Sequence, residues 1–380
     1  MPEDKKKTTA LTTSVGADDG QSIPRNTNII ADKDGDYNPV ERDYEELLRE
    51  MNRRAAPDYL HTVTMSELYR NVYTGRAPII DGLLCSGAYI LAGAPKIGKS
   101  FLVAQIAYHV STGEPLWDYT VRQGTVLYLA LEDDYQRLQN RLFRMFGVND
   151  TENLHFAVAA KQLGNGLDEQ LERFVREHPD TKLIIVDTLQ KVRDATGEAY
   201  SYAGDYEIIG RMKQFADRHN ICVLFVHHTR KQPAIDTFET ISGTTGLLGC
   251  ADGAMLMYKK YRVGNTAALE IVGRDQQDQR LYLQRDTERL IWTFESADEQ
   301  FWSEPSDPIV EAVAGLLTAE QPEWSGSATE LVEQLSLDLP ANALTKRLNV
   351  KAGKLQSDYN IRYENKHSRN GSRISLMLLS

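Results

Sequence analysis

The chain has 380 residues, a length that suggests two domains and additional sequence outside them. Hydrophobic residues make up 41% and charged residues 26%, as in ordinary soluble globular proteins, and no run of about eighteen apolar residues predicts a membrane span. The net charge of −11 argues against a general polyanion binder, so any contact with nucleic acid must be local.

The amino-terminal segment, residues 1–55, has little apolar periodicity and is rich in Asp, Lys, Thr and Asn. We expect it to be disordered, apart from a short helix over Asp43–Asn52, because it offers too little apolar surface to offset the entropy of ordering. Positive charges near its start are not followed by an apolar stretch, so it does not read as a secretory signal.

A pattern of apolar strands alternating with amphipathic helices fills residues 56–300. The predicted strands are Ala88–Ala92, Thr125–Leu131, Leu154–Ala159, Leu183–Val186 and Cys222–Val226, and the predicted helices are Ser100–Val110, Asp133–Phe146, Leu167–Glu177 and Asp205–Arg218. Because strands buried on both faces read as continuous apolar runs, this alternation predicts an α/β fold with a mostly parallel sheet. After Gly253 four further segments read as consecutive antiparallel strands: Ala254–Tyr258, Ala268–Val272, Arg280–Gln284 and Leu290–Phe294.

A second domain is predicted over residues 306–380. A helix over Ile309–Leu317, a capping box at Ser327 and Glu330 that opens a helix to Leu335, and a helix from Ala341 to about Leu355 come first. Two strands then flank Asn370-Gly371, a strong hairpin signal. Three helices and a terminal hairpin are typical of a winged-helix-like domain that binds DNA or a partner.

The three cysteines, Cys85, Cys222 and Cys250, lie far apart in apolar stretches and without a histidine cluster. This spacing argues against a disulfide framework and against a zinc site. It favours a reducing compartment, so we expect a cytoplasmic protein.

Residues Gly93–Ser100 fit the phosphate-loop pattern G-x-x-x-x-G-K-[ST] between a predicted strand and a predicted helix. Glycines let the backbone wrap the phosphates of ATP, and the free N–H groups of the following helix point at them. Lys99 is expected to bridge the terminal phosphates, and the Ser100 hydroxyl to bind Mg²⁺. The predicted nucleotide-binding residues are Gly93, Ala94, Pro95, Lys96, Ile97, Gly98, Lys99, Ser100 and Phe101. A structural turn is the alternative, and the strand–loop–helix context argues against it.

Two acidic residues follow strands and are candidates for the chemistry. Asp187 ends the strand LIIVD and can reach Mg²⁺, with helix capping as its alternative role. Glu132 follows the next strand after the phosphate loop, and it would face the γ-phosphate as the general base if that strand lay beside the phosphate-loop strand. Its alternative role is also helix capping, which Asp133 and Asp134 fill better.

The strand Cys222–Val226 ends in two histidines, His227 and His228. A polar side chain at this strand tip can contact the γ-phosphate, and imidazole donates a hydrogen bond in either tautomer. We favour His228 as this sensor and expect the other histidine to be a buried structural residue.

Together with Ser242–Asp252, these motifs over residues 60–295 resemble the RecA-type ATPases, and more narrowly the RepA-type hexameric replicative helicases of plasmids and mobile elements. The resemblance implies a RecA-like core, ATP and Mg²⁺ as cofactors, and a homo-oligomeric ring, a hexamer, with each nucleotide between two subunits. It also implies DNA as a partner, with single-stranded DNA in the ring channel, and a primase or initiator protein as a candidate partner. Pro95 and Lys96 are not diagnostic of it, and residues 1–55 and 306–380 are additions to a minimal ring ATPase.

The resemblance further implies an arginine finger from the neighbour's late hairpin. Arg274, at the end of the strand IVGR, matches it best, with Arg280 and Arg285 as further candidates. A solvated residue at the tip of a hairpin is the alternative reading of Arg274.

Basic residues near aromatic ones are the candidate DNA contacts. Lys191 and Arg193 follow the magnesium aspartate, Arg230 and Lys231 follow the sensor, and plain solvated loops are the alternative in both places. Residues 341–380 carry roughly six net positive charges, which is typical of a duplex-DNA surface, although winged helices also bind proteins. The predicted contacts there are Lys346, Arg347, Lys351, Arg369 and Arg373.

The sequence therefore predicts an ATP-hydrolysing ring ATPase that acts as a DNA helicase or translocase in replication of a mobile element. Two alternatives remain at this stage: a nucleotide-switched DNA-binding regulator and a RecA-like recombination mediator. Translocation polarity, ring size, DNA sequence preference and the identity of partners do not follow from the sequence.

Overall fold

The structure is a computed structural model that describes residues 48–73, 78–193, 202–229, 237–241, 245–259, 264–274, 276–298, 307–368 and 371–379. It divides into two compact units, Met1–Val63 and Thr64–Ser380. In the first unit residues 48–55 are helical, and Glu50 accepts hydrogen bonds from Arg53 and Arg54 at 2.9 and 2.8 Å. The helix predicted over Asp43–Asn52 is thus confirmed where it is described. The disorder predicted for residues 1–55 is wrong for residues 53–55, which continue this helix, and residues 1–47 fall outside the described residues.

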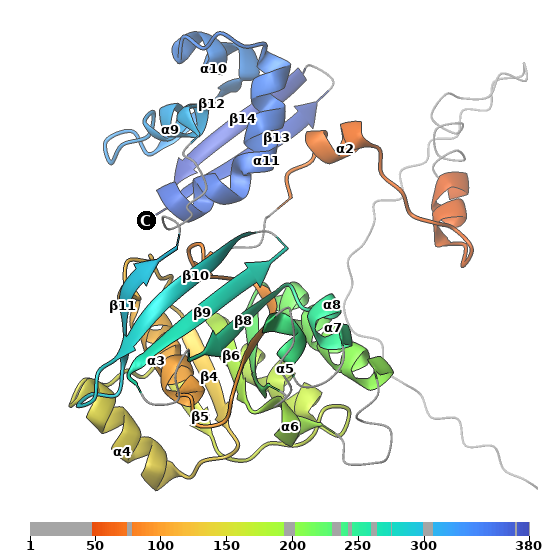
Figure 1. The fold of residues 1–380 in the computed structure, drawn as a ribbon. Helices are drawn as coiled ribbons and strands as arrows, with labels where there is room; N and C mark the ends of the chain where they lie inside the picture. Colours follow the sequence, from red (N-terminus) through yellow and green to blue (C-terminus); the bar gives the residue numbers. More distant parts are fainter. Residues whose placement is uncertain are drawn as a thin grey trace, which may run out of the picture. The chain divides into compact units, whose positions relative to one another are not determined.

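A nine-stranded sheet forms the centre of the second unit, with helices on both of its faces (Figure 1). Its strands in spatial order are β11 (Trp292–Ala297), β10 (Gln276–Arg285), β9 (Thr266–Gly273), β8 (Gly253–Tyr258), β3 (Gly87–Gly93), β7 (Cys222–His228), β6 (Thr181–Asp187), β4 (Thr125–Ala130) and β5 (Leu154–Ala157). The six strands from β8 to β5 are parallel, and β8 to β11 pair antiparallel. The predicted α/β class, a mostly parallel sheet extended by antiparallel strands, is confirmed.

Two apolar layers cover the faces of this sheet because the side chains of each strand alternate between them. Leu91 of β3 points into the layer beneath α3 (Lys99–Thr112) and α4 (Tyr135–Phe146). Ile90 points into the layer formed by the helices on the other face. Those helices are α5 (Leu167–Glu177), α6 (Leu189–Val192), α7 (Tyr202–His219) and α8 (Thr245–Cys250). Every residue of β3, β4 and β8 except Tyr258 is buried, which explains their continuous apolar runs.

Strand order was the part of the topology that the sequence did not determine. β4 does not lie beside β3, because β7 and β6 stand between them. Glu132 was predicted to face the γ-phosphate on the assumption that its strand lies beside β3, and that assumption is wrong. The position of Glu132 itself is described with the site below. A short hairpin of β1 (Pro78–Ile80) and β2 (Leu84–Cys85), the helices α6 and α8, and the 3-10 turn Thr237–Thr240 were also not predicted.

The carboxyl-terminal segment has its own apolar core. Its elements are α9 (Pro308–Ala314), β12 (Glu323–Ser327), α10 (Ala328–Gln334), α11 (Ala341–Tyr359), β13 (Ile361–Ser368) and β14 (Gly371–Leu378). The three helices and the terminal hairpin are present as predicted, and the capping box of Ser327 and Glu330 is formed. β12, which was not predicted, completes a three-stranded sheet in the order β12-β14-β13.

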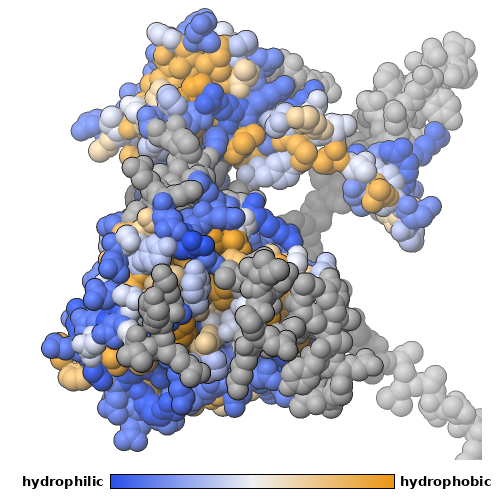
Figure 2. All heavy atoms as spheres, in the orientation of Figure 1, coloured by the Kyte–Doolittle hydropathy of each residue, from blue (hydrophilic) through white to orange (hydrophobic). Residues whose placement is uncertain are grey.

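Helix α2 (Met65–Arg70) packs against α11. Asn349 of α11, which is buried, donates from its amide to the carbonyl oxygens of Tyr69 and Arg70, both at 2.9 Å. Its carbonyl oxygen accepts from the Tyr363 hydroxyl at 2.7 Å. Since the last carbonyls of a helix lack partners within it, Asn349 satisfies the end of α2. Met65 and Leu68 of α2 are exposed, and Figure 2 shows hydrophobic residues on the surface of this helix.

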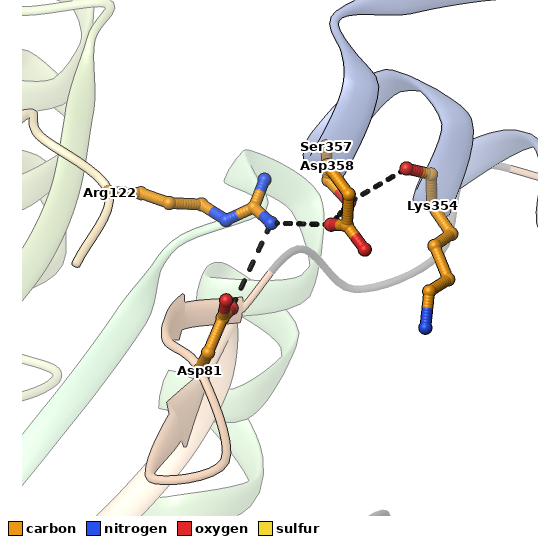
Figure 3. Close-up of polar contacts among 5 residues, drawn as sticks. All are labelled: Asp81, Arg122, Lys354, Ser357 and Asp358. Atoms are coloured by element: carbon orange, nitrogen blue, oxygen red, sulfur yellow. Dashed lines mark hydrogen bonds and ion pairs between the residues drawn. The ribbon is translucent and has the colours of Figure 1, made fainter. Parts of the chain in front are cut away.

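Arg122 lies between two carboxylates, as Figure 3 shows. Its Nη2 is 3.8 Å from Oδ1 of Asp81 and 3.1 Å from Oδ1 of Asp358 at the end of α11. Ser357 donates a hydrogen bond to the same Asp358 oxygen at 2.6 Å. Burial raises the pKa of Asp81 above its ordinary value, and Arg122 opposes this shift.

Candidate nucleotide-binding site

The predicted phosphate loop connects the end of β3 to the start of α3, as the motif requires. Lys99 is buried, and its Nζ donates to the carbonyl oxygens of Gly93 at 2.7 Å and Ala94 at 3.1 Å. Burial lowers the pKa of Lys99 to about 8, while Asp187 and Glu132 act in the opposite direction. The ammonium group is therefore held inside the loop, with two carboxylates close enough to influence its charge.

The four strand ends that carry the predicted polar residues meet at one edge of the sheet. In the register of the parallel strands Gly93 pairs with His228, and Ala130 pairs with Asp187. Glu132 comes two residues after Ala130, so it lies at the same edge although its strand is not adjacent to β3. Carboxyl ends of parallel strands open onto ligand sites in such sheets. The structure thus brings together Lys99, Ser100, Asp187, His228 and Glu132.

Asp187 is held by two hydroxyl groups. The Tyr128 hydroxyl donates to its Oδ2 at 2.9 Å, and the Ser100 side chain forms a hydrogen bond that lowers the pKa of the carboxylate. Burial acts more strongly and raises that pKa above its ordinary value. Tyr128 was not singled out from the sequence because, in the strand TVLYLA, it reads as one more apolar core residue.

Glu132 is exposed, unlike Asp187, and its Oε1 accepts a hydrogen bond from Thr188 Oγ1 at 3.2 Å. Thr188 follows Asp187 directly and is buried. Helix α4 does not use Glu132 as its cap, because Asp134 is the N-cap and accepts from Arg137 N at 2.8 Å. An accessible carboxylate fixed beside the strand end is suited to orient and deprotonate a water molecule.

The two histidines at the end of β7 differ in their surroundings. His228 Nδ1 lies 3.4 Å from Lys99 Nζ, whereas His227 is buried. Burial lowers the pKa of His228, and Lys99 acts in the same direction, so the neutral imidazole is favoured. This placement agrees with the prediction that His228, rather than its neighbour, faces the phosphate loop.

Trp292 supports the phosphate loop from β11, which the sequence did not reveal. Its indole Nε1 donates to the carbonyl oxygen of Gly98 at 3.2 Å, and its side chain is fully buried. Gln105 holds the Trp292 backbone by accepting from its N–H at 2.8 Å and donating to its carbonyl oxygen at 2.9 Å. A cavity of about 470 Å³ lined by Gln105, Trp117 and Trp292 lies beside this contact and does not include Lys99 or Glu132.

Gly98 is required at its position for two reasons. Its φ of +113° lies in the region that favours glycine, and a Cβ there would come within 2.8 Å of the Trp292 ring. We expect Gly98→Ala to lower the free energy of unfolding by about 2 kcal/mol, measured by denaturant titration, and to weaken ATP binding. Gly147→Ala is the matched control, because Gly147 also has a positive φ but a Cβ would meet no atom within 4 Å. Equal ATP affinity in both variants would contradict this role of Gly98.

The three candidate finger arginines lie in different environments. Arg280 donates hydrogen bonds to Glu270 at 2.8 Å and to Asp298 at 3.0 Å, and the bond to Glu270 raises the pKa of Arg280 further. Arg285 lies near this chain's own phosphate loop, since its guanidinium stacks on Phe101. Arg274 is exposed, and the register of β9, β8 and β3 places it at the edge of the sheet opposite the phosphate loop.

The predicted DNA contacts are only partly described. Lys191 is exposed on α6, but Arg193 is buried, so its side chain does not lie on the surface. Arg347 pairs with Asp307 at 2.8 Å, whereas Lys346 and Arg373 are exposed and Lys351 is partly buried. The remaining predicted contacts, Arg230, Lys231 and Arg369, lie outside the described residues.

A protein-family model matches the part of the chain that contains this candidate site. Residues 55–234, which include the phosphate loop, Glu132 and Asp187, match the family model AAA_25, described as an AAA domain. This segment is a P-loop ATPase domain. The expectation of a P-loop ATPase is thereby confirmed. No curated protein matches the chain.

Solved structures resemble the chain at low identity. One of them, described as an ATPase domain, is 15% identical, with 69% of this chain and 100% of that chain covered and a TM-score of 0.45. A DnaB-like replicative helicase, described with its interactions with primase, is 16% identical over 67% of this chain and 71% of that chain, with a TM-score of 0.44. Neither likeness is close enough to assign a function to this ATPase domain.

Among the described residues, no helix is both long and apolar enough to cross a membrane. Over the same part of the chain, no three His, Cys, Asp or Glu side chains gather as a metal site.

Proposed function

We propose that this P-loop ATPase hydrolyses ATP as a ring-forming DNA helicase or translocase in replication of a mobile element. The observation that carries the proposal is the position of Glu132. Thr188 donates a hydrogen bond to it, which holds it near Asp187 at the edge of the sheet where Lys99 also lies. A protein that only held its nucleotide would need the phosphate loop but not an accessible carboxylate at this place. The site therefore has the parts for turnover.

Side chains at this edge would divide the work of hydrolysis. Lys99 would hold the phosphates with its ammonium group, and Glu132 would accept a proton from the attacking water. His228, neutral beside Lys99, would donate or accept a hydrogen bond as the terminal phosphate leaves. Each of these groups is held by a contact within the domain, so little reorganisation is needed when ATP binds.

The residues present also fit a magnesium ion. The Ser100 hydroxyl and the Asp187 carboxylate are hydrogen-bonded to each other, and oxygen ligands of this kind suit Mg²⁺. These two side chains would hold the ion, directly or through water. When bound, Mg²⁺ would neutralise charge on the triphosphate.

A ring is proposed because the candidate finger cannot serve its own site. Arg274 is exposed at the sheet edge opposite Lys99, and its Nη2 donates to the Gly249 carbonyl oxygen at 2.8 Å. An arginine in this position could complete only the site of an adjoining copy, in trans. We therefore propose a homo-oligomer, a hexamer by resemblance, with nucleotide between subunits.

DNA contact is proposed through two surfaces. Lys191 is exposed on α6, directly after the strand that ends in Asp187, and could report the state of the nucleotide to single-stranded DNA. The carboxyl-terminal segment, with its order of helix, strand, two helices and hairpin, supports a winged-helix-like domain, and Lys346 and Arg373 are exposed on it. A primase or initiator protein is proposed as a further partner.

We expect single-stranded DNA to raise the ATPase rate of the full chain at least about tenfold, because the proposed channel residues are joined to the catalytic edge. The measurement is steady-state phosphate release with and without a poly-dT oligonucleotide, together with strand separation on a forked duplex. Hydrolysis without any DNA response would contradict the motor proposal. Slow hydrolysis with sequence-specific duplex binding, lost when residues 306–380 are deleted, would instead identify a nucleotide-switched regulator.

A further inference from the structure

Tyr128 carries a hydroxyl group into an apolar layer. Its side chain is fully buried beneath α3, where phenylalanine would fill nearly the same space. A buried hydroxyl needs a hydrogen-bond partner, and this one donates to Oδ2 of Asp187 at 2.9 Å. A carboxylate only accepts, so the tyrosine is the donor. The hydroxyl is therefore explained by Asp187 and not by the packing of the layer.

The register of the sheet brings these two side chains together. β4 pairs with β6 so that Tyr128 lies opposite Ile185 and Ala130 lies opposite Asp187. Residues two positions apart on a strand face the same side of the sheet, so all four side chains lie on the α3 face. Tyr128 and Asp187 are diagonal neighbours, a separation that an aromatic side chain can span. The methyl group of Ala130, directly opposite Asp187, leaves room for the tyrosine to extend along the sheet.

The position of the Tyr128 hydroxyl is itself fixed by the neighbouring strand β5. Tyr128 pairs with Phe156 in the register of β4 and β5, and their ring centroids are 5.5 Å apart. Because the tyrosine ring is enclosed on all sides, its hydroxyl has little freedom to follow a carboxylate that rotates. The hydrogen bond therefore holds Oδ2 of Asp187 in one place, so this carboxylate faces the site in one orientation.

We propose that Tyr128 is a positioning residue for the divalent cation, because it fixes the orientation in which Asp187 presents its carboxylate to Mg²⁺. Hydrogen bonds to a ligating carboxylate commonly act in this way, and loss of one lowers metal affinity by about 10- to 100-fold. This inference rests on the proposed function only in that Ser100 and Asp187 hold the ion of a bound nucleoside triphosphate. It adds a residue that acts through Asp187 and contacts neither the ion nor the nucleotide.

The experiment measures metal affinity directly, with Mn²⁺ as the probe. Mn²⁺ is titrated into the full chain loaded with a slowly hydrolysed ATP analogue, with protein in excess over nucleotide, and free Mn²⁺ is followed by electron paramagnetic resonance. Tyr128→Phe removes the hydroxyl and keeps the ring, so we expect it to weaken Mn²⁺ binding about tenfold. The affinity for the analogue without metal, measured by calorimetry in EDTA, should stay unchanged, because Tyr128 does not contact the phosphate loop in this scheme.

Tyr119→Phe is the matched control. Tyr119 is also a buried tyrosine, and its hydroxyl donates to Oε1 of Gln279 at the same distance of 2.9 Å, away from the site. Both variants lose one buried hydrogen bond, so both should lose similar stability in a denaturant titration. Only Tyr128→Phe should lose Mn²⁺ affinity. Wild-type Mn²⁺ affinity in Tyr128→Phe, with the same loss of stability as in Tyr119→Phe, would reduce Tyr128 to a packing residue and overturn the proposal.

Turnover provides a second measurement that a structural role would not change. The Mg²⁺ concentration that gives half of the maximal ATPase rate should rise about tenfold in Tyr128→Phe, and saturating Mg²⁺ should restore most of the rate. A general loss of structure would not be repaired by the metal. A reduced rate that Mg²⁺ fails to restore would therefore contradict a role through the ion.

A double substitution tests whether the tyrosine acts through the carboxylate. Asp187→Asn alone should weaken Mn²⁺ binding, and the addition of Tyr128→Phe should weaken it no further, because the two side chains form one unit. Additive losses would overturn the proposed route through Asp187. The Mn²⁺ measurement needs neither hydrolysis nor DNA. A chain that ignores DNA would therefore refute the proposed motor and leave the role of Tyr128 standing, whereas unchanged Mn²⁺ affinity in Tyr128→Phe would do the reverse.

Discussion

Replacement of Glu132 by glutamine is expected to reduce steady-state ATP turnover by about 10²- to 10⁴-fold, the usual contribution of a general base. The amide keeps an oxygen for the hydrogen bond from Thr188 Oγ1, so the local structure should persist. What is lost is the ability to take a proton from water. ATP affinity should stay within about threefold of wild type, because Glu132 does not hold the phosphates in this scheme.

Asp134→Asn provides the control for this substitution. It makes the same carboxylate-to-amide change two residues away, and asparagine is as good a helix N-cap as aspartate. Its turnover should therefore match wild type. Wild-type hydrolysis by Glu132→Gln would exclude this residue as the base and remove the observation on which the motor proposal depends. Loss of ATP binding in the same variant would assign Glu132 to binding instead of catalysis.

The local parts of the site could be predicted because they depend on short stretches of sequence. The phosphate loop needs only a strand, a glycine-containing turn and a helix in succession. Gly93–Ser100 accordingly connects β3 to α3, as the motif predicts. Asp187 and His228 could be assigned because each stands at the end of an apolar run. Parallel strands bring their carboxyl ends to one edge whatever their order.

Strand order depends on contacts between segments far apart in the sequence, and the sequence pattern does not contain it. Placing Glu132 through a β4 adjacent to β3 was wrong, since β7 and β6 intervene. The residue still reaches the site because the whole edge is shared and Thr188 holds it there. The role of Glu132 as the base stays a prediction, now resting on this shared edge and no longer on an adjacent strand.

Residues that support the site from a distance could not be found by pattern. Trp292 lies 194 positions after Gly98, whose carbonyl oxygen it contacts, and it reads in the sequence as one apolar residue of a late strand. Asn349 likewise reads as a polar residue of a basic helix, yet it is buried and binds the end of α2. Long-range hydrogen bonds of this kind become visible only when the fold is known.

The net charge of a segment predicts DNA contacts less well than the burial and ion pairing of its individual basic side chains. Arg193 and Arg347 both counted toward predicted DNA surfaces, but the first is buried and the second pairs with Asp307. Glu364 likewise forms ion pairs within β13, with Arg362 Nη2 at 2.7 Å and with Lys366 Nζ at 3.1 Å. Net charge per segment therefore overstates the cations available to phosphates, and Lys346 and Arg373 are better first targets for substitution.

Replacement of Lys99 by alanine is expected to weaken ATP binding about a hundredfold and to abolish measurable turnover, since it removes charge-assisted hydrogen bonds to phosphate. The ammonium group already lies between the Gly93 and Ala94 carbonyl oxygens, so it is positioned before ATP arrives. Binding is measured by calorimetry and turnover by phosphate release. Unchanged affinity would show that the backbone amides of the loop hold the triphosphate alone.

The pH dependence of ATP affinity separates the charge of Lys99 from its shape. Burial lowers its pKa to about 8, so the fraction of charged lysine falls as the pH rises above that value. Because the charged form holds the phosphates, ATP affinity should be greatest below pH 8 and fall by up to about tenfold per pH unit above it. Lys99→Arg keeps a charge throughout this range, so any ATP binding it retains should not follow this titration. If the wild-type affinity were flat between about pH 7 and 10, Lys99 would not contribute through its charge, and the loss in Lys99→Ala would have to come from the packing of the loop.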